Sequence, residues 1–141
     1  MLKQPKTPVS NEEKEQMAAV FSSTCSRSNL CLVKDIMAGY CDKWSMYTIL
    51  LLGQHRKIRF NELRSAISGI SQRMLTVTLR SLEKNGIVSR TMYPQIPPRV
   101  EYQLTPLGES LLKQLLQLAG WAEENFAEIM KAKKRYEKIN A

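Results

Sequence analysis

The last third of the chain constrains the fold most, because it predicts one helix too long for a domain of this size. Thr105 followed by Pro106 is typical of a helix start, and nothing stops that helix before about residue 138, although Gly120 is expected to bend it. Such a helix is about 50 Å long. Part of its apolar face therefore needs a second chain, and the spacing of four and three residues selects as interface candidates Leu107, Leu111, Leu115, Leu118 and Phe126.

The length of 141 residues, with 43% hydrophobic residues, predicts one globular domain with an appendage at each end. We expect an arm and helix in 1–28 that join the dimer interface, a central domain in 29–105, and a dimerisation helix and tail in 106–141. No run of about 18 apolar residues occurs, and the first residues contain no apolar segment. The sequence therefore predicts neither a membrane span nor a signal peptide. We expect a cytoplasmic protein.

Positive charge is concentrated in the middle of the chain. Residues 54–100 carry nine basic and two acidic groups, which accounts for +7 of the net charge of +8. A basic block between neutral ends is what binding to nucleic acid requires, because each Lys or Arg at a phosphate releases a counterion. A basic surface that only keeps the protein soluble explains the charge alone equally well.

The spacing of apolar residues and turn residues predicts a mainly α (α+β) chain. We expect helices at 11–22 after Ser10, at about 30–39, at 43–53, at 62–67 with Asn61 as cap, at 71–84, and from 106 onward. Two β-prone runs at 87–93 and 99–105 flank a proline-rich tip and predict a two-stranded hairpin. A helix, a turn, a second helix and a basic hairpin form a winged helix-turn-helix.

The helix at 71–84 is the predicted recognition helix, because its leucines face inward and its other side is polar and basic. A helix can read the major groove when its outer side offers donors to base edges. The candidate base readers are Ser71, Gln72, Arg73, Thr76 and Arg80. The candidate phosphate or wing contacts are Arg56, Lys57, Arg90 and Arg99.

Other functions have less support in the residues. The chain lacks a histidine cluster, a glycine-rich phosphate loop and a paired acidic site, so we predict no enzyme, no cofactor and no metal site. The alternative function is a winged-helix adaptor that binds protein rather than specific DNA; apolar residues on the recognition face would be its mark. We expect double-stranded DNA as the partner and no membrane.

Residues 31–121 also carry a family resemblance. Cys31 stands thirteen residues before Trp44, and the following stretch reads RFNELRSAISGISQRMLTVTLRSLEKNGIVSRTMYPQIPPRVEYQLTPLGESL. These motifs closely resemble the HxlR-type winged-helix transcriptional regulators. The resemblance implies a homodimer that docks two recognition helices into an inverted-repeat operator. The chain departs from the family pattern at Leu32, where proline is usual, and at Cys41-Asp42, where small residues are usual.

The resemblance also implies a redox role for one of the three cysteines, because some members sense oxidants or electrophiles at the position of Cys31. At a helix start with Arg27 and Lys34 nearby, its thiolate would be favoured. The candidate resolving partners are Cys25 and Cys31 of the partner subunit. An inert, buried Cys31 is the alternative, in which case a small-molecule effector would act elsewhere.

Overall fold

The computed structural model describes residues 9–23 and 37–141, in two units that comprise residues 1–40 and 41–141. The first unit contains α1 (Asn11–Ser23). Its predicted start at Ser10 is confirmed: the Ser10 N–H donates to Glu13 Oε2 at 2.9 Å, and the Glu13 N–H donates to Ser10 Oγ at 3.2 Å. This reciprocal pair is a capping box. Most of the helix expected at about 30–39, with Cys31, lies outside the described residues.

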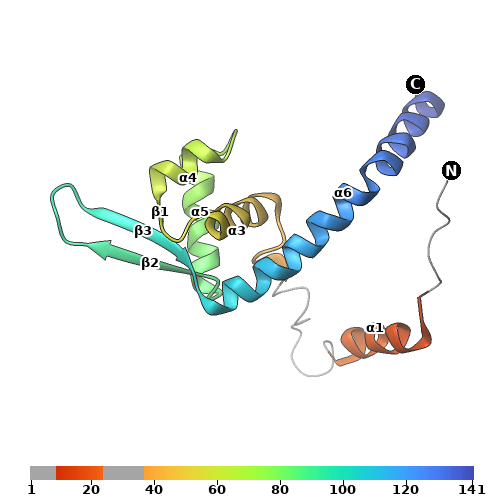
Figure 1. Ribbon diagram of the computed structural model, residues 1–141, viewed down its shortest axis with the longest axis horizontal. Helices are drawn as coiled ribbons and strands as arrows, with labels where there is room; N and C mark the ends of the chain where they lie inside the picture. Colours follow the sequence, from red (N-terminus) through yellow and green to blue (C-terminus); the bar gives the residue numbers. More distant parts are fainter. Residues whose placement is uncertain (1–8, 24–36) are drawn as a thin grey trace. The chain divides into compact units, whose positions relative to one another are not determined.

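The second unit has the element order of a winged helix-turn-helix, as predicted (Figure 1). Its elements are α3 (Lys43–Gln54), β1 (Ile58–Arg59), α4 (Phe60–Ala66), α5 (Gln72–Lys84), β2 (Val88–Tyr93), β3 (Arg99–Leu104) and α6 (Pro106–Asn140). Helices α4 and α5 form the helix-turn-helix, and the hairpin of β2 and β3 is the wing. No helix in the described ranges is long and apolar enough to cross a membrane.

The sheet has one strand more than the predicted hairpin. Its antiparallel order is β1-β3-β2, and β1 joins through the pairs Ile58 with Tyr102 and Arg59 with Glu101. A strand of two residues is too short to show an alternating pattern, so sequence reasoning missed it.

One helix start differs from the sequence expectations, and a second helix, which starts at Lys43 as predicted, has a cap that was not predicted. Helix α4 begins at Phe60, so the prediction of Asn61 as its cap was wrong; instead the Arg59 N–H donates to Glu62 Oε2 at 2.9 Å. Helix α3 is capped by Asp42, whose Oδ1 accepts the Ser45 N–H at 3.0 Å. The departure from the family pattern at Asp42 therefore supplies a helix cap.

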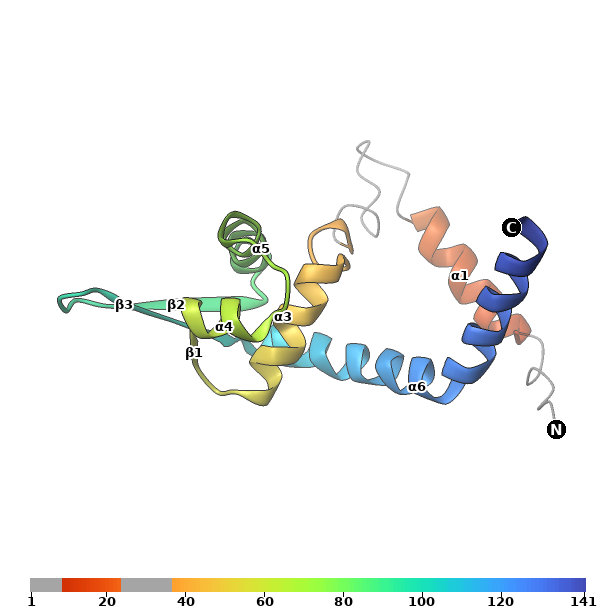
Figure 2. The same ribbon diagram turned by 90° about the horizontal axis from the view of Figure 1, so that it is seen from above.

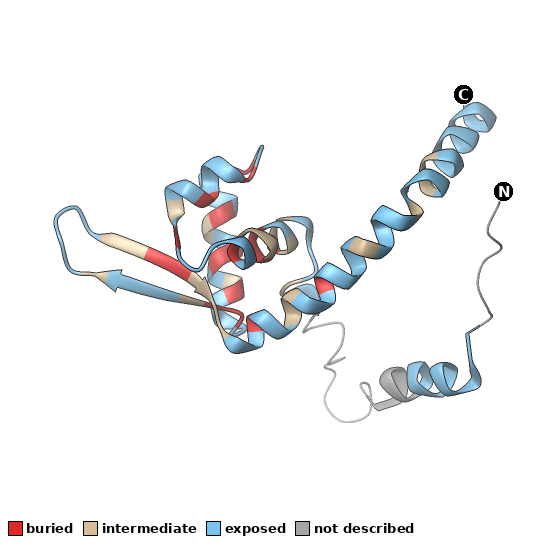
Figure 3. Cartoon of the chain, viewed as in Figure 1, coloured by how far each residue is buried: buried red, intermediate tan, exposed pale blue. Residues whose placement is uncertain are grey.

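The core lies where α3, α4 and α5 meet the sheet. The side chains of Ile49, Leu63, Leu75 and Leu82 are fully buried there. Figure 3 shows the buried residues gathered in these helices and in the strands next to them, whereas most of α6 is exposed. This core holds α5 by one face and leaves its other face in solvent.

Helix α6 is joined to the wing by its first turn and then leaves the core. Thr105 caps it, since Thr105 Oγ1 accepts the Gly108 N–H at 3.0 Å, and the Thr105 N–H donates to the Ile87 carbonyl at 3.0 Å. Among its residues only Gly108 and Leu115 are buried. Figure 2 shows that the helix changes direction in its second half. Its 35 residues correspond to about 50 Å of helix measured along the axis.

Candidate nucleic-acid interface

Helix α5 is fixed in place at both ends and along one side. Ser71 Oγ accepts the Met74 N–H at 3.0 Å, and after the last turn Gly86 takes a left-handed backbone conformation with φ of 74°. The buried residues Leu75, Thr78, Leu79 and Leu82 anchor the helix to the core. The start, the stop and the inward face all agree with the sequence prediction.

The opposite side of α5 presents arginine side chains to solvent. At about 100° per residue, Arg73 and Arg80 lie about 150° or more from the centre of the buried side. Both are exposed. Gln72 and Thr76 lie nearer to α4, where Arg64 Nη1 donates to Gln72 Oε1 at 3.5 Å. The Thr76 hydroxyl donates to the Gln72 carbonyl at 2.8 Å, and the Ser71 hydroxyl serves as the cap acceptor.

A hollow of about 270 Å³ joins this side of α5 to the wing. Its lining includes three predicted base readers and one predicted phosphate contact: Gln72, Thr76, Arg80 and Arg90. Phe60 and Tyr102 supply apolar lining, and Glu83 supplies an acid. Arg90 pairs with Tyr102 across the sheet and is exposed. The fold therefore brings the predicted recognition helix and one basic wing residue around a single concave surface.

Arg56 and Lys57 lie apart from that surface. They line a larger hollow of about 1050 Å³ that also includes Gln103 and Lys113. Successive side chains of a strand point to opposite faces, so Gln103 and Tyr102 place the two hollows on opposite faces of the sheet. Both basic residues are exposed.

Arg99 already has an anionic partner inside the wing. Its guanidinium forms an ion pair with Glu101 and lies over the Tyr93 ring, 5.5 Å from the centroid. Burial by itself raises the pKa of Glu101, but hydrogen bonds from Arg99 and Tyr93 and the charges of Arg99 and Lys57 lower it below its usual value. This network ties Arg99 to its neighbours in the wing while its side chain stays 40% exposed, and Arg90 is the more exposed of the two.

The predicted interface residues of α6 divide into two groups. Leu107, Leu118 and Phe126 are 57%, 54% and 61% exposed, whereas Leu111 is half-buried. Leu115 is only 8% exposed and belongs to the core of its own subunit. Trp121, which the candidate set omitted, is 57% exposed on the same helix. The fold leaves a long apolar surface on α6 without a cover among the described residues.

Comparison with known proteins decides the family. The model of the HxlR-like helix-turn-helix family matches residues 40–131. The chain belongs to this family. The HTH-type transcriptional regulator YtfH of Escherichia coli is 37% identical over 102 residues, which cover 71% of this chain and 79% of YtfH.

Solved structures agree with the HxlR assignment. The regulator ytfH from Salmonella typhimurium has a TM-score of 0.69 at 32% identity and covers 76% of this chain and 95% of its own. The redox regulator HypR in its reduced form has a TM-score of 0.65 at 39% identity, with coverage of 70% and 97%. The family and these relatives are transcriptional regulators, not enzymes. This HxlR-family chain is therefore a transcriptional regulator with a helix-turn-helix domain.

One cysteine of this HxlR-family regulator can be placed. Cys41 is exposed and free, and partial desolvation of its sulfur together with the charge of Asp42 raises the pKa of its thiol. A raised pKa keeps the thiol protonated and slows its reaction with oxidants. Cys25 and Cys31 lie outside the described residues. Within the described ranges no three His, Cys, Asp or Glu side chains gather as metal ligands do.

The structure also contains features that the sequence did not indicate. Arg64 on α4 adds a cation beside Gln72, and Val77 stands exposed on α5 between the two arginines. A helical projection of 71–84 would have shown Val77; Arg64 needed the packing of α4 on α5.

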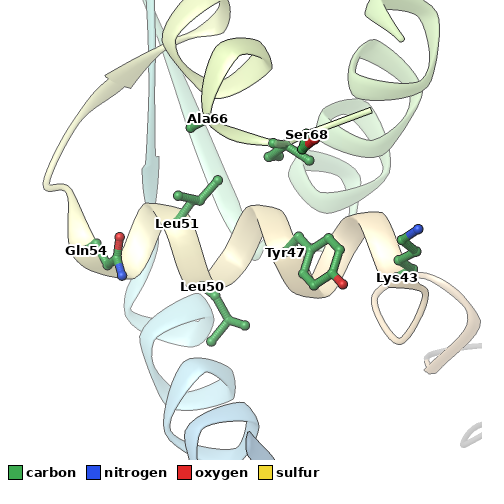
Figure 4. A pocket seen from close by; sticks show the side chains of 8 residues that line it. Lys43, Tyr47, Leu50, Leu51, Gln54, Ala66 and Ser68 are labelled. Atoms are coloured by element: carbon green, nitrogen blue, oxygen red, sulfur yellow. The ribbon is translucent and has the colours of Figure 1, made fainter. Parts of the chain in front are cut away.

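A cleft of about 440 Å³ lies between α3 and the turn after α4 (Figure 4). Its lining combines Leu50, Leu51 and Ile67 with Lys43 and Tyr47. An apolar floor beside a few polar groups is the usual character of a small-molecule site. No sequence pattern indicated this cleft, because its lining comes from two separate segments.

Proposed function

We propose that this regulator binds double-stranded DNA sequence-specifically, with α5 in the major groove. The outer face of α5 supports this most directly, because it presents Arg73 and Arg80 on a helix whose other face is anchored in the core. A guanidinium can donate two hydrogen bonds to O6 and N7 of guanine, and a Gln side chain can pair with adenine. Gln72, exposed in the first turn of the same helix on the side toward α4, is the candidate for such an adenine contact.

Contacts with the phosphate backbone of the DNA come from the cations around the outer face of α5. Arg90 shares the hollow with Arg80, so a phosphate beside the recognition helix lies within reach of the wing. Arg64 adds charge from α4. Arg56 and Lys57 are proposed as contacts outside the groove, on the other face of the sheet. Phosphate contacts hold the protein in register and make binding depend on salt.

The regulator acts as a homodimer on an inverted repeat. The support is the exposed apolar surface of α6, where Leu107, Leu118, Trp121 and Phe126 each expose more than half of their surface. A second copy of the same helix covers such a surface with matching residues. Two recognition helices then meet half-sites about 34 Å apart, which gives an operator with the symmetry of the dimer.

The test selects preferred duplexes from a random library and measures binding by variants of the full chain. Arg73→Ala is expected to cost about 1 to 3 kcal/mol on the selected duplex and to relax base preference. Arg135→Ala in α6 removes the same charge far along the chain from α5 and serves as the control. An equal loss on selected and random DNA for Arg73→Ala would refute base reading by this residue.

The second candidate function is a protein-binding adaptor, and one observation favours it. Met74 and Val77 on α5 are 41% and 54% exposed, and apolar residues on that face are the expected mark of a protein contact. A salt titration on both the selected duplex and random DNA separates the two functions. A DNA-binding regulator keeps its preference for the selected duplex as salt rises, whereas an adaptor gives weak, salt-sensitive binding without sequence preference.

We further propose that oxidation at Cys31 controls operator binding, with the similarity to a redox regulator as support. Mild diamide would take two electrons and two protons from Cys31 and a second thiol, either Cys25 or Cys31 of the partner subunit, and leave a disulfide. Cys31→Ser is expected to abolish the response of operator affinity to diamide. Cys41→Ser, at a thiol of raised pKa, is expected to keep it. If both variants respond like the natural protein, Cys31 is not the sensor.

A further inference from the structure

Val77 is an apolar side chain in an exposed and otherwise basic place. It follows Arg73 by four residues and precedes Arg80 by three, so all three occupy neighbouring positions on one helix face. Val77 is 54% exposed. It lies about 150° from the centre of the buried side of α5, whereas Met74 lies only about 90° from it. Val77 therefore stands near the middle of the surface that faces outward.

We infer that Val77 recognises the C5-methyl group of thymine, an inference that rests on the proposed binding of α5 in the major groove. Among the groups that base pairs present there, this methyl is the apolar one; the others are hydrogen-bond donors and acceptors. A valine side chain can satisfy none of those polar groups, and covering them without a partner is costly. A thymine methyl instead loses its water shell against the valine at no such cost.

The flanking arginines specify where that thymine lies. Guanidinium groups on either side of Val77 seek the O6 and N7 acceptors of guanine, so the three side chains together favour a half-site with thymine close to guanine. The same two cations make this small apolar spot a poor surface for an apolar protein partner, because docking would desolvate both charges.

The expected effect follows from the size of a methyl group. Burial of one such group changes affinity about fourfold, the ratio that corresponds to about 0.8 kcal/mol. Replacing the contacted thymine with deoxyuridine removes only this methyl and leaves base pairing unchanged. The natural protein is therefore expected to bind about fourfold more weakly for each half-site so changed.

The experiment uses the full chain and the duplex it selects from a random library, with deoxyuridine placed at one thymine at a time. For the natural protein one thymine in each half-site should show the loss, and for Val77→Ala that loss should fall below about twofold while the guanine preference remains. A second variant is Val77→Thr, which keeps the shape of the side chain. The matched control is Val9→Ala, at a valine of the first unit that is 47% exposed.

Two outcomes overturn the inference, and they are distinguishable. If the natural protein selects a sequence but Val77→Ala shows the same deoxyuridine losses at every position, Val77 does not read a methyl group. If the natural protein selects no sequence at all, the proposed DNA-binding function fails, and the inference fails with it.

Discussion

Replacement of Gly108 by alanine is expected to destabilise the winged helix strongly. Gly108 is buried in the first turn of α6, and a Cβ atom built there would lie 2.1 Å from the Ile87 carbonyl oxygen and 3.1 Å from Leu104 Cδ2. That oxygen cannot move away freely, because it accepts the Thr105 N–H at 3.0 Å and the Thr105 hydroxyl at 3.2 Å. The methyl group therefore separates α6 from the start of the wing.

The magnitude follows from three contributions. Forcing a methyl group into a filled space costs about 1 to 3 kcal/mol. Losing the two hydrogen bonds from Thr105 costs about 1 kcal/mol each. Alanine gains about 1 kcal/mol over glycine inside a helix. We therefore expect Gly108→Ala to lower the free energy of unfolding by about 2 to 4 kcal/mol.

Gly120→Ala in the same helix is the matched control. A Cβ atom at Gly120 would meet nothing within 4 Å, so only the gain in helix propensity of about 1 kcal/mol applies. Urea unfolding followed by circular dichroism at one fixed protein concentration measures both variants. If Gly108→Ala is as stable as the natural protein, the close contact with Ile87 does not limit this position and the reasoning is refuted.

Three further predictions concern the acid response, the dimer and the wing. The pKa of Glu101 is lowered in the folded state, so near and below the ordinary glutamate pKa of about 4.3 the unfolded chain binds more protons than the folded chain. The ionised Glu101 therefore stabilises the fold above that pH, and this stabilisation is lost as the pH falls through the lowered pKa. For Glu101→Gln the free energy of unfolding should fall less steeply with acid than for the natural protein. Serine at both Leu118 and Phe126 should give folded monomers in sedimentation, and a dimer of unchanged mass would place the interface elsewhere. Arg90→Ala should reduce the slope of log binding constant against log salt concentration by about one unit, with little effect on the free energy of unfolding, whereas Arg99→Ala should chiefly lower the free energy of unfolding. Equal effects of the two variants in both assays would contradict the assigned roles.

Features that depend on neighbouring residues could be predicted from the sequence alone. The starts of α1, α5 and α6 are where Ser10, Ser71 and Thr105 place them, because a cap bonds to backbone only two or three residues ahead. The inward face of α5 follows from the spacing of its leucines in the same way. The polar and basic outer face of α5, and hence most of the candidate base readers, needed no tertiary information.

Features that depend on residues far apart in the chain were decided by the tertiary structure. Strand β1 forms because β3 offers it a partner, and two residues alone carry no pattern. Leu115 has the same spacing as the exposed leucines of α6, but only the packing of the helix start on the core buries it. Arg99 is basic like Arg90, yet its contacts with Glu101 and Tyr93 tie it to the wing. In each case the side chain's role is set by what approaches it in space, and a local sequence pattern contains no record of that approach.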